Sequence, residues 1–262
     1  MNKIIISDEI KTNLDNSIDV NLEECNELFG VCKIVITPIC DTKLEILYNI
    51  PNFKADVIVN MPEGVNFEIF ELRESENVKV KYEYNLEKMS NLKISKFYDV
   101  SKVKELDTIN LNGEGAYVEY VLKTIATDKQ DFNLRLYHNA KGTISKIVNN
   151  GVNVSGSIDF KVEGIVPKGI SGCELNQNSR IVTFNDNVCK IDPIFLIDDN
   201  DVIADHSALI GRFSEEELFY LKLRGIDHNS AINLLVKGFL LDSIDDDRLD
   251  NIIKKYWRWL NE

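Results

Sequence analysis

The spacing of apolar residues changes along the chain from a period of two to helical spacing near residue 206. Residues 33–205 contain short β-branched runs in which apolar and polar positions alternate. The run at 78–86 is the clearest, because Val78, Val80, Tyr82 and Tyr84 share one face while lysines and glutamates occupy the other. The pattern predicts a long, mainly β region followed by a helical tail.

Turn-forming residues separate the predicted strands, and they occur at 62–64 (Pro-Glu-Gly), 112–113 and 150–151 (Asn-Gly) and 168–169 (Lys-Gly). Two all-β architectures fit this arrangement. A sandwich or barrel is the common solution for short strands at such spacing. A β-solenoid is the alternative, because strands recur with little sign of helices between them. The chain shows no strict repeat, so the pattern alone leaves both architectures open.

The two ends of the chain are predicted to contain helices. Within the mixed N-terminal segment, residues 1–32, the stretch at 21–30 fits a short helix that ends at Gly30. In the tail, Ser214 and Glu217 form a capping box that starts one helix, and Gly225 ends it. Asp227 or Ser230 starts a second helix, which ends at Gly238 and Phe239.

A third helix is predicted from the acidic run at 242–250 onward, since negative charge is favourable at a helix N-terminus. It carries an apolar stripe of Leu249, Ile252, Ile253, Tyr256, Trp257 and Leu260. This stripe is expected to be buried, either against the rest of the chain or against a partner protein.

The net charge, the lack of long apolar runs and the cysteine spacing disfavour several classes of function. The 262 residues carry a formal net charge of −13, which disfavours nucleic acid as a partner. No apolar run is long enough to span a membrane, and the N-terminus lacks a secretory signal, so we expect a cytoplasmic protein. The five cysteines show neither a CxxC pair nor zinc-site spacing.

The segment from Ala204 to Leu240 resembles the C-terminal signature of the SufB/SufD family of iron–sulfur cluster assembly proteins. That signature is a histidine followed by small residues, an acidic stretch, and two helices of the LFYL-x-x-RGI and A-x-x-L-L-V-x-GF types. The matching residues here are His206, Ser207, Ala208, Glu215, Glu216, Glu217, Leu218, Phe219, Tyr220, Leu221, Arg224, Gly225, Ile226, Ala231, Leu235, Val236, Gly238 and Phe239. A weaker similarity extends upstream to about residue 132 and includes His138, Thr143, Ser145, Gly151, Gly156, Ser157, Gly164, Lys168, Gly169 and Gln177.

The resemblance implies a mainly β fold, a right-handed parallel β-helix (solenoid) core with a C-terminal α-helical subdomain. It favours the solenoid over the sandwich and divides the chain into 1–32, 33–206 and 207–262. It also implies a scaffold rather than an enzyme, which dimerises with itself or with a SufB/SufD paralogue. An ABC-type ATPase of the SufC type would bind the tail, at Leu218, Phe219, Tyr220, Leu221, Arg224, Gly225, Gly238 and Phe239.

A transient iron–sulfur cluster is the implied cargo, and His206 and Cys189 are the candidate ligands, because such clusters bind thiolates and imidazoles. Ser207 departs from the family, in which SufB-type members have a glutamate after the histidine. The alternative is therefore a structural partner of the ATPase that has lost cluster binding. A third hypothesis, a polysaccharide-active β-helix, rests on Asp198, Asp199 and Asp201, which a solvated turn explains better.

Overall fold

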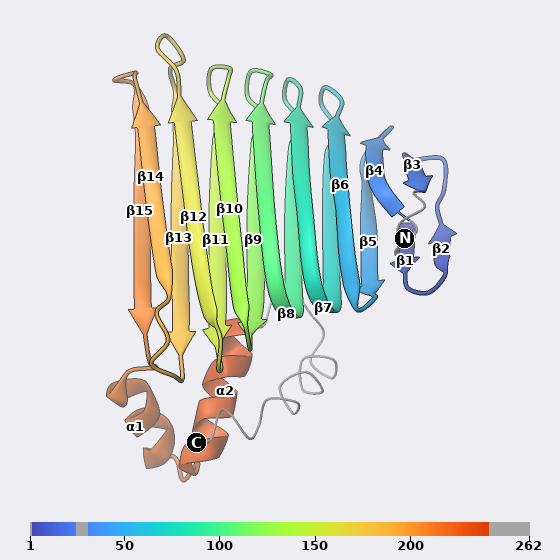
Figure 1. Ribbon diagram of the computed structural model, residues 1–262. Helices are drawn as coiled ribbons and strands as arrows, with labels where there is room; N and C mark the ends of the chain where they lie inside the picture. The colour runs from blue at the N-terminus through green and yellow to red at the C-terminus, as the bar shows by residue number, and fades with distance from the viewer. Residues whose placement is uncertain (1, 25–30, 241–262) are drawn as a thin grey trace.

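Residues 2–24 and 31–240 are described by the computed structural model, in which strands wind into a β-solenoid of about seven turns followed by two helices (Figure 1). The predicted mainly β fold with a helical tail is therefore confirmed. The sandwich alternative is wrong, because most neighbouring strands are parallel and successive turns stack along one axis. No helix in the described part of the chain is long and apolar enough to cross a membrane.

Each turn of the solenoid contributes one strand to each of two parallel sheets. The first sheet contains β5 (Thr42–Asn49), β9 (Tyr117–Ala126), β11 (Ile144–Asn153), β13 (Cys173–Thr183) and β15 (Val202–Gly211). The second sheet contains β6 (Asn52–Met61), β10 (Lys129–His138), β12 (Ser157–Val166) and β14 (Lys190–Ile197). The long strands β7 (Asn66–Leu86) and β8 (Asn91–Leu111) take part in both, since β7 pairs with β5 through its first half and with β6 through its second.

The length of a turn varies, which explains why the sequence shows no strict repeat. Asn52 and Asn77 stack on adjacent turns 25 residues apart, whereas Asn149 and Ser179 stack 30 residues apart. The expected turn at Asn150–Gly151 is also wrong, because both residues lie inside β11. A side chain at Gly151 would meet Ile158 Cδ1 at 2.6 Å, so the glycine leaves room for the Ile158 side chain.

Two antiparallel hairpins cover the N-terminal end of the solenoid. In the first, β1 (Asn2–Ile6) pairs with β2 (Ile10–Asn13), and β1 also stacks in parallel on β5. In the second, β3 (Ile18–Glu24) pairs with β4 (Val31–Pro38). The helix expected at 21–30 is therefore wrong over 21–24, and its remainder lies outside the described residues.

The interior between the two sheets is filled by alternate residues of β5 to β13. Val78, Val80, Tyr82 and Tyr84 are all buried there, as the alternation at 78–86 predicts. Most interior positions are aliphatic or aromatic, and one continuous apolar cluster runs from Ile4 to Ile181. Apolar burial on this scale is the main stabilising contribution to such a fold.

The tail begins later than expected, because β15 continues to Gly211. Helix α1 (Glu215–Leu223) starts with the predicted capping box of Ser214 and Glu217, and Gly225 follows it with φ of +81°. Asp227 accepts a hydrogen bond from the Ser230 backbone N–H at 3.0 Å and caps α2 (His228–Leu240). Gly238 and Phe239 do not end α2, which runs on to Leu240, and the third predicted helix lies outside the described residues.

Both helices lie below the turns at one edge of the solenoid, under its C-terminal half (Figure 1). A second apolar cluster joins them to the strands, and it contains Leu72, Phe97, Ile125, Val152, Val182, Phe213, Leu218, Ala231, Ile232, Val236 and Leu240. The Arg180 guanidinium on β13 lies over the rings of Phe213 and Phe239, at 5.8 and 5.4 Å from their centroids. The helices are thus packed against the middle and last turns of the solenoid.

Candidate functional site

The C-terminal end of the solenoid is open. Strand β15 pairs with β13 through one edge, and β14 pairs with β12 through one edge; no described strand pairs with their other edges. The interior positions of β15 are consequently much more exposed than their partners on β13. Ile210 is 42% exposed, whereas its partner Ile181 is fully buried.

His206 and Gln177 lie side by side at this end. They are register partners on β15 and β13, and the His206 ring lies 5.3 Å from the ring of Phe195 on β14. Gln177 is only 4% exposed, yet neither its amide nitrogen nor its amide oxygen has a hydrogen-bond partner among the described residues. An open hollow of about 330 Å³ adjoins both residues. A buried amide without partners is unfavourable, so this end has unused hydrogen-bonding capacity.

Cys189 occupies a different position. Its Sγ accepts hydrogen bonds from the Asn153 side-chain amide at 3.2 Å and from the Ile158 backbone N–H at 3.4 Å. Burial raises the pKa of the Cys189 thiol, although both donated bonds act in the opposite direction. The thiol is therefore held in its protonated form near neutral pH.

The structure does not bring Cys189 and His206 together within one chain. Cys189 precedes Phe195, the residue that contacts His206, by six residues along β14. Six residues of extended strand span roughly 20 Å. No group of three or more His, Cys, Asp or Glu side chains in the described part of the chain is arranged to hold a metal ion. Of the acidic cluster, Asp199 accepts the backbone N–H groups of Gly169 and Asp201, which is a turn-forming role.

The residues predicted to bind a partner divide into two groups. Leu218, Leu221 and Phe239 face the solenoid and join the second apolar cluster. Phe219 and Tyr220 face solvent and are 61% and 54% exposed. Leu223 is also exposed, and Arg224 lies over the Tyr220 ring at 4.4 Å from its centroid. The exposed group forms an apolar surface on α1 with a cation at its edge.

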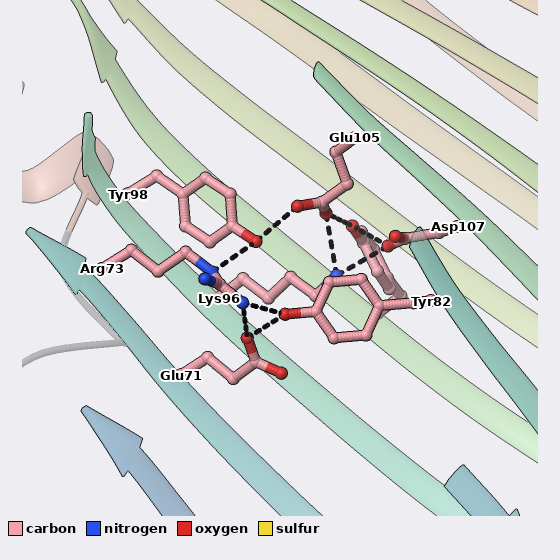
Figure 2. A network of polar contacts seen from close by, with 8 residues as sticks. Glu71, Arg73, Tyr82, Lys96, Tyr98, Glu105 and Asp107 are labelled. Atoms are coloured by element: carbon pink, nitrogen blue, oxygen red, sulfur yellow. Dashed lines mark hydrogen bonds and ion pairs between the residues drawn. The ribbon is translucent and has the colours of Figure 1, made fainter. Parts of the chain in front are cut away.

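A buried network of charged residues and tyrosines crosses the middle of the solenoid between the two sheets (Figure 2). Lys96 on β8 donates hydrogen bonds to Glu105 at 2.8 Å and to Asp107 at 2.7 Å. Arg73 on β7 donates to Glu71 at 3.3 Å and to the Tyr98 hydroxyl at 3.1 Å. All five charged side chains are almost completely buried.

Tyrosine hydroxyls link the two halves of this network. The Tyr98 hydroxyl donates to Glu105 at 2.5 Å, the Tyr120 hydroxyl donates to Asp107 at 2.7 Å, and the Tyr82 hydroxyl donates to Glu71 at 2.5 Å. Burial raises the pKa of Asp107 to about 7; the neighbouring Glu105 carboxylate adds to this effect and Lys96 opposes it. Three carboxyl groups face two cations, so a proton on Asp107 balances the charge.

A second buried polar cluster lies at the ends of β10, β11 and β13. The His138 ring nitrogens lie 2.7 Å from the Thr143 hydroxyl and 3.0 Å from the Ser145 hydroxyl. The Cys173 thiol lies 3.3 Å from the Thr143 hydroxyl. Burial lowers the pKa of His138 to about 4, so its imidazole is neutral at physiological pH.

Neither buried cluster was predicted from the sequence as a polar site. The sequence nevertheless contains a signal for the charged network. In β7, Glu71 and Arg73 continue the alternation of inward-facing residues that starts with Phe67 and Ile69. In β8, Lys96 continues the alternation that starts with Leu92 and Ile94. A charged residue at an interior position of an alternating strand indicates a buried charge with partners.

Comparisons with known proteins agree with the similarity found in the tail. The family model for the SufBD core domain of the SUF system of FeS cluster assembly matches residues 73–239. The iron–sulfur cluster assembly protein SufD of Bacillus subtilis is 30% identical over 153 residues, which cover 57% of this chain and 35% of that protein.

Two other relatives show similar identities. An iron–sulfur cluster assembly SufBD family protein of Synechocystis is 26% identical over 141 residues, covering 52% of this chain and 29% of that protein. A SufBD family protein of Galdieria sulphuraria is 28% identical over 131 residues, covering 49% of this chain and 58% of that protein. The match thus covers less than two thirds of each of these relatives, between 29% and 58% of their lengths.

Proposed function

The chain belongs to the SufBD family of iron–sulfur cluster assembly proteins, and on that premise we propose that it is a scaffold that holds a nascent cluster at its open solenoid end. A SufC-type ABC ATPase is its proposed partner, bound through α1 and α2. The proposed role is that of a scaffold component and not of an enzyme.

The proposal rests on the open C-terminal end of the solenoid. An exposed edge strand beside an unfilled apolar interior is a surface that pairs with another strand. His206 is the fifth of the ten residues of β15. If two copies, or this chain and a paralogue, pair their β15 strands antiparallel about a two-fold axis that lies between the level of His206 and that of Cys189, then His206 of one chain lies level with Cys189 of the other. Such a dimer would also cover Gln177 and the exposed interior of the last turn.

The chemistry of the two candidate ligands supports a site that forms only on assembly. A neutral imidazole and a thiolate both bind iron. The Cys189 thiol is protonated, so it must release its proton when a metal binds. Because Cys189 and His206 lie far apart in one chain, we propose that a cluster uses ligands from two chains.

Anaerobic reconstitution with iron and sulfide tests the cluster site. We expect visible absorption from the wild type and a clear reduction in the Cys189→Ser and His206→Ala variants. Cys40→Ser is the matched control, since Cys40 is exposed near the opposite end of the solenoid. Equal absorption from all four proteins would remove both ligand assignments.

Co-purification with a SufC-type ATPase tests the proposed ATPase contact. The exposed side chains of Phe219 and Tyr220 are the proposed contact, so Phe219→Asp and Tyr220→Ser should abolish binding. Ile39→Asp is the control, because Ile39 has the same exposed fraction, 61%, and lies on the N-terminal part of the solenoid. Loss of binding in the control variant as well would contradict the assignment.

A structural partner of the ATPase is the second candidate. It is favoured by Ser207, which stands where SufB-type members have a glutamate, and by the distance between Cys189 and His206. This candidate predicts ATPase binding through α1 without any reconstituted cluster. The two experiments therefore separate the candidates.

A further inference from the structure

The interior column of residues that ends at His206 changes character at the open end of the solenoid. In register from β5 to β15, the column reads Leu44, Ile69, Ile94, Tyr120, Ile147, Gln177 and His206. The first five are aliphatic or aromatic, whereas the last two are a neutral amide and an imidazole. Because burial of an amide without partners is unfavourable, an apolar residue at position 177 would suit stability better. The amide therefore indicates a role beyond packing.

The Gln177 amide extends across the interior toward the second sheet. A Cβ atom at Gly164 on β12 would lie 2.7 Å from Leu175 Cδ2 and 3.2 Å from Gln177 Nε2, so the glycine leaves room for both side chains. Gly164 and Phe195 are register partners on the second sheet, as Gln177 and His206 are on the first. Gln177 thus faces Gly164, and His206 faces Phe195 one strand further out.

Gln177 is the polar neighbour that His206 meets directly. Along β15 the next interior residues are Ala204 and Ala208, and across the interior the ring meets Phe195. None of these three has a hydrogen-bonding side chain. Gln177 lies on the adjacent strand, about 4.8 Å away, and neither polar atom of its amide has a partner among the described residues. The exposed His206 ring can turn toward this amide.

We propose that Gln177 is a positioning residue for His206, an inference that rests on the proposed role of His206 as a cluster ligand. The Gln177 amide oxygen accepts a hydrogen bond from one ring nitrogen of His206. A neutral imidazole has one N–H, so the other ring nitrogen then presents its lone pair to the metal. Gln177 Nε2 stays unpaired and remains available to the cargo or to a second chain.

The tautomer of His206 tests this hydrogen bond without any metal. Side-chain ¹⁵N NMR of the whole chain at about pH 8.5 observes neutral imidazoles. The chain has three histidines, so the signals that His206→Ala removes identify this residue. We expect one dominant tautomer in the wild type, and a change in the tautomer ratio of about fivefold in Gln177→Met, which has similar size but no acceptor. Gln177→Glu keeps an acceptor and should restore the wild-type ratio.

Ser179→Ala is the matched control. Ser179 is a buried polar residue two positions along β13, and it already accepts a hydrogen bond from Asn149 Nδ2 at 3.1 Å. Its removal should leave the His206 tautomer unchanged. An equal change in this control would mean that the substitutions merely loosen the open end, and the proposal would be overturned.

Anaerobic reconstitution with iron and sulfide then tests the consequence for the cluster. Visible absorption should fall in Gln177→Met and recover in Gln177→Glu. If the wild type forms no cluster, the proposed function fails and the positioning role fails with it. If the wild type forms a cluster but Gln177→Met has the wild-type tautomer ratio or the wild-type absorption, only the assignment of Gln177 is wrong.

Discussion

Two buried glutamines, one in the middle of the solenoid and one near its end, differ in their hydrogen bonding. Gln130, on β10, is fully buried; it accepts a hydrogen bond from the Thr124 hydroxyl at 2.7 Å and donates to the carbonyls of Val100 and Ile125 at 2.5 and 3.0 Å. Gln177, on β13, is almost as buried but has no partner among the described residues. Both polar atoms of the Gln130 amide are thus satisfied within one chain, whereas those of the Gln177 amide are not.

The difference follows from the neighbours that each turn has. A middle turn lies between two others and receives hydrogen-bond partners from both, as the Glu71, Arg73, Lys96, Glu105 and Asp107 network shows (Figure 2). Gln177 lies one strand in from the end, on β13, and the final strand β15 beside it has no described neighbour at its outer edge. Polar groups buried there remain unsatisfied until another chain or a cargo supplies partners.

The largest expected effect tests whether the charged network is structural. In Lys96→Met the carboxylates of Glu105 and Asp107 lose their cation while remaining buried. We expect the free energy of unfolding, measured in urea, to fall by about 3–5 kcal/mol. Lys93→Met on the exposed side of the same strand should change it by less than about 0.5 kcal/mol. A small effect of Lys96→Met would show that the buried carboxylates of Glu105 and Asp107 do not depend on the Lys96 cation.

The next effect concerns pH. Because the pKa of Asp107 is raised to about 7, the folded state holds a proton between about pH 4 and 7 that the unfolded state has released. Stability should therefore fall as pH rises through this window, by about 2–3 kcal/mol between pH 5 and 8. Asp107→Asn removes this dependence, so urea unfolding of both proteins across that range should give a clearly different slope for the variant. Parallel curves would contradict the assignment.

The sequence predicts much of the fold and less of the site. Alternation correctly gives the interior face of 78–86, and the capping box correctly starts α1 at Glu215. Periodicity could not separate solenoid from sandwich, because turns of 25 and 30 residues hide the repeat; the family resemblance decided this point.

The positions of the site residues could not be predicted from the sequence, for physical reasons. Glu71 and Lys96 are charged, so pattern analysis assigns them to solvent, although their parity places them inside. Asn150–Gly151 has the composition of a turn, but its glycine serves close packing in β11. Cys189 and His206 are 17 residues apart in sequence, yet Cys189 directly precedes β14 and His206 lies midway along β15. Only the register of the strands reveals this distance.

A third, smaller effect concerns the satisfied glutamine. Gln130→Leu removes three hydrogen bonds and leaves the Thr124 hydroxyl and two buried carbonyls with fewer partners. The free energy of unfolding should fall by about 1–3 kcal/mol. Chemical denaturation of the wild type and of the variant at one pH measures this difference. No change would mean that the hydrogen bonds of Gln130 add nothing to the stability of the fold.

The smallest effect on stability is expected at the open end, for a substitution of Gln177. Gln177→Leu removes an amide that has no partner in the isolated chain, so the stability of the monomer should stay the same or rise by up to about 1 kcal/mol. If the amide finds its partners across a dimer interface, the same variant should weaken self-association, which sedimentation velocity measures. Monomer stability would then stay the same or rise while self-association weakens. A residue that only packs in the core would not produce this combination. A loss of monomer stability equal to that of Gln130→Leu would instead mean that Gln177 is already satisfied within its own chain, and the open end would lose its main support as an assembly surface.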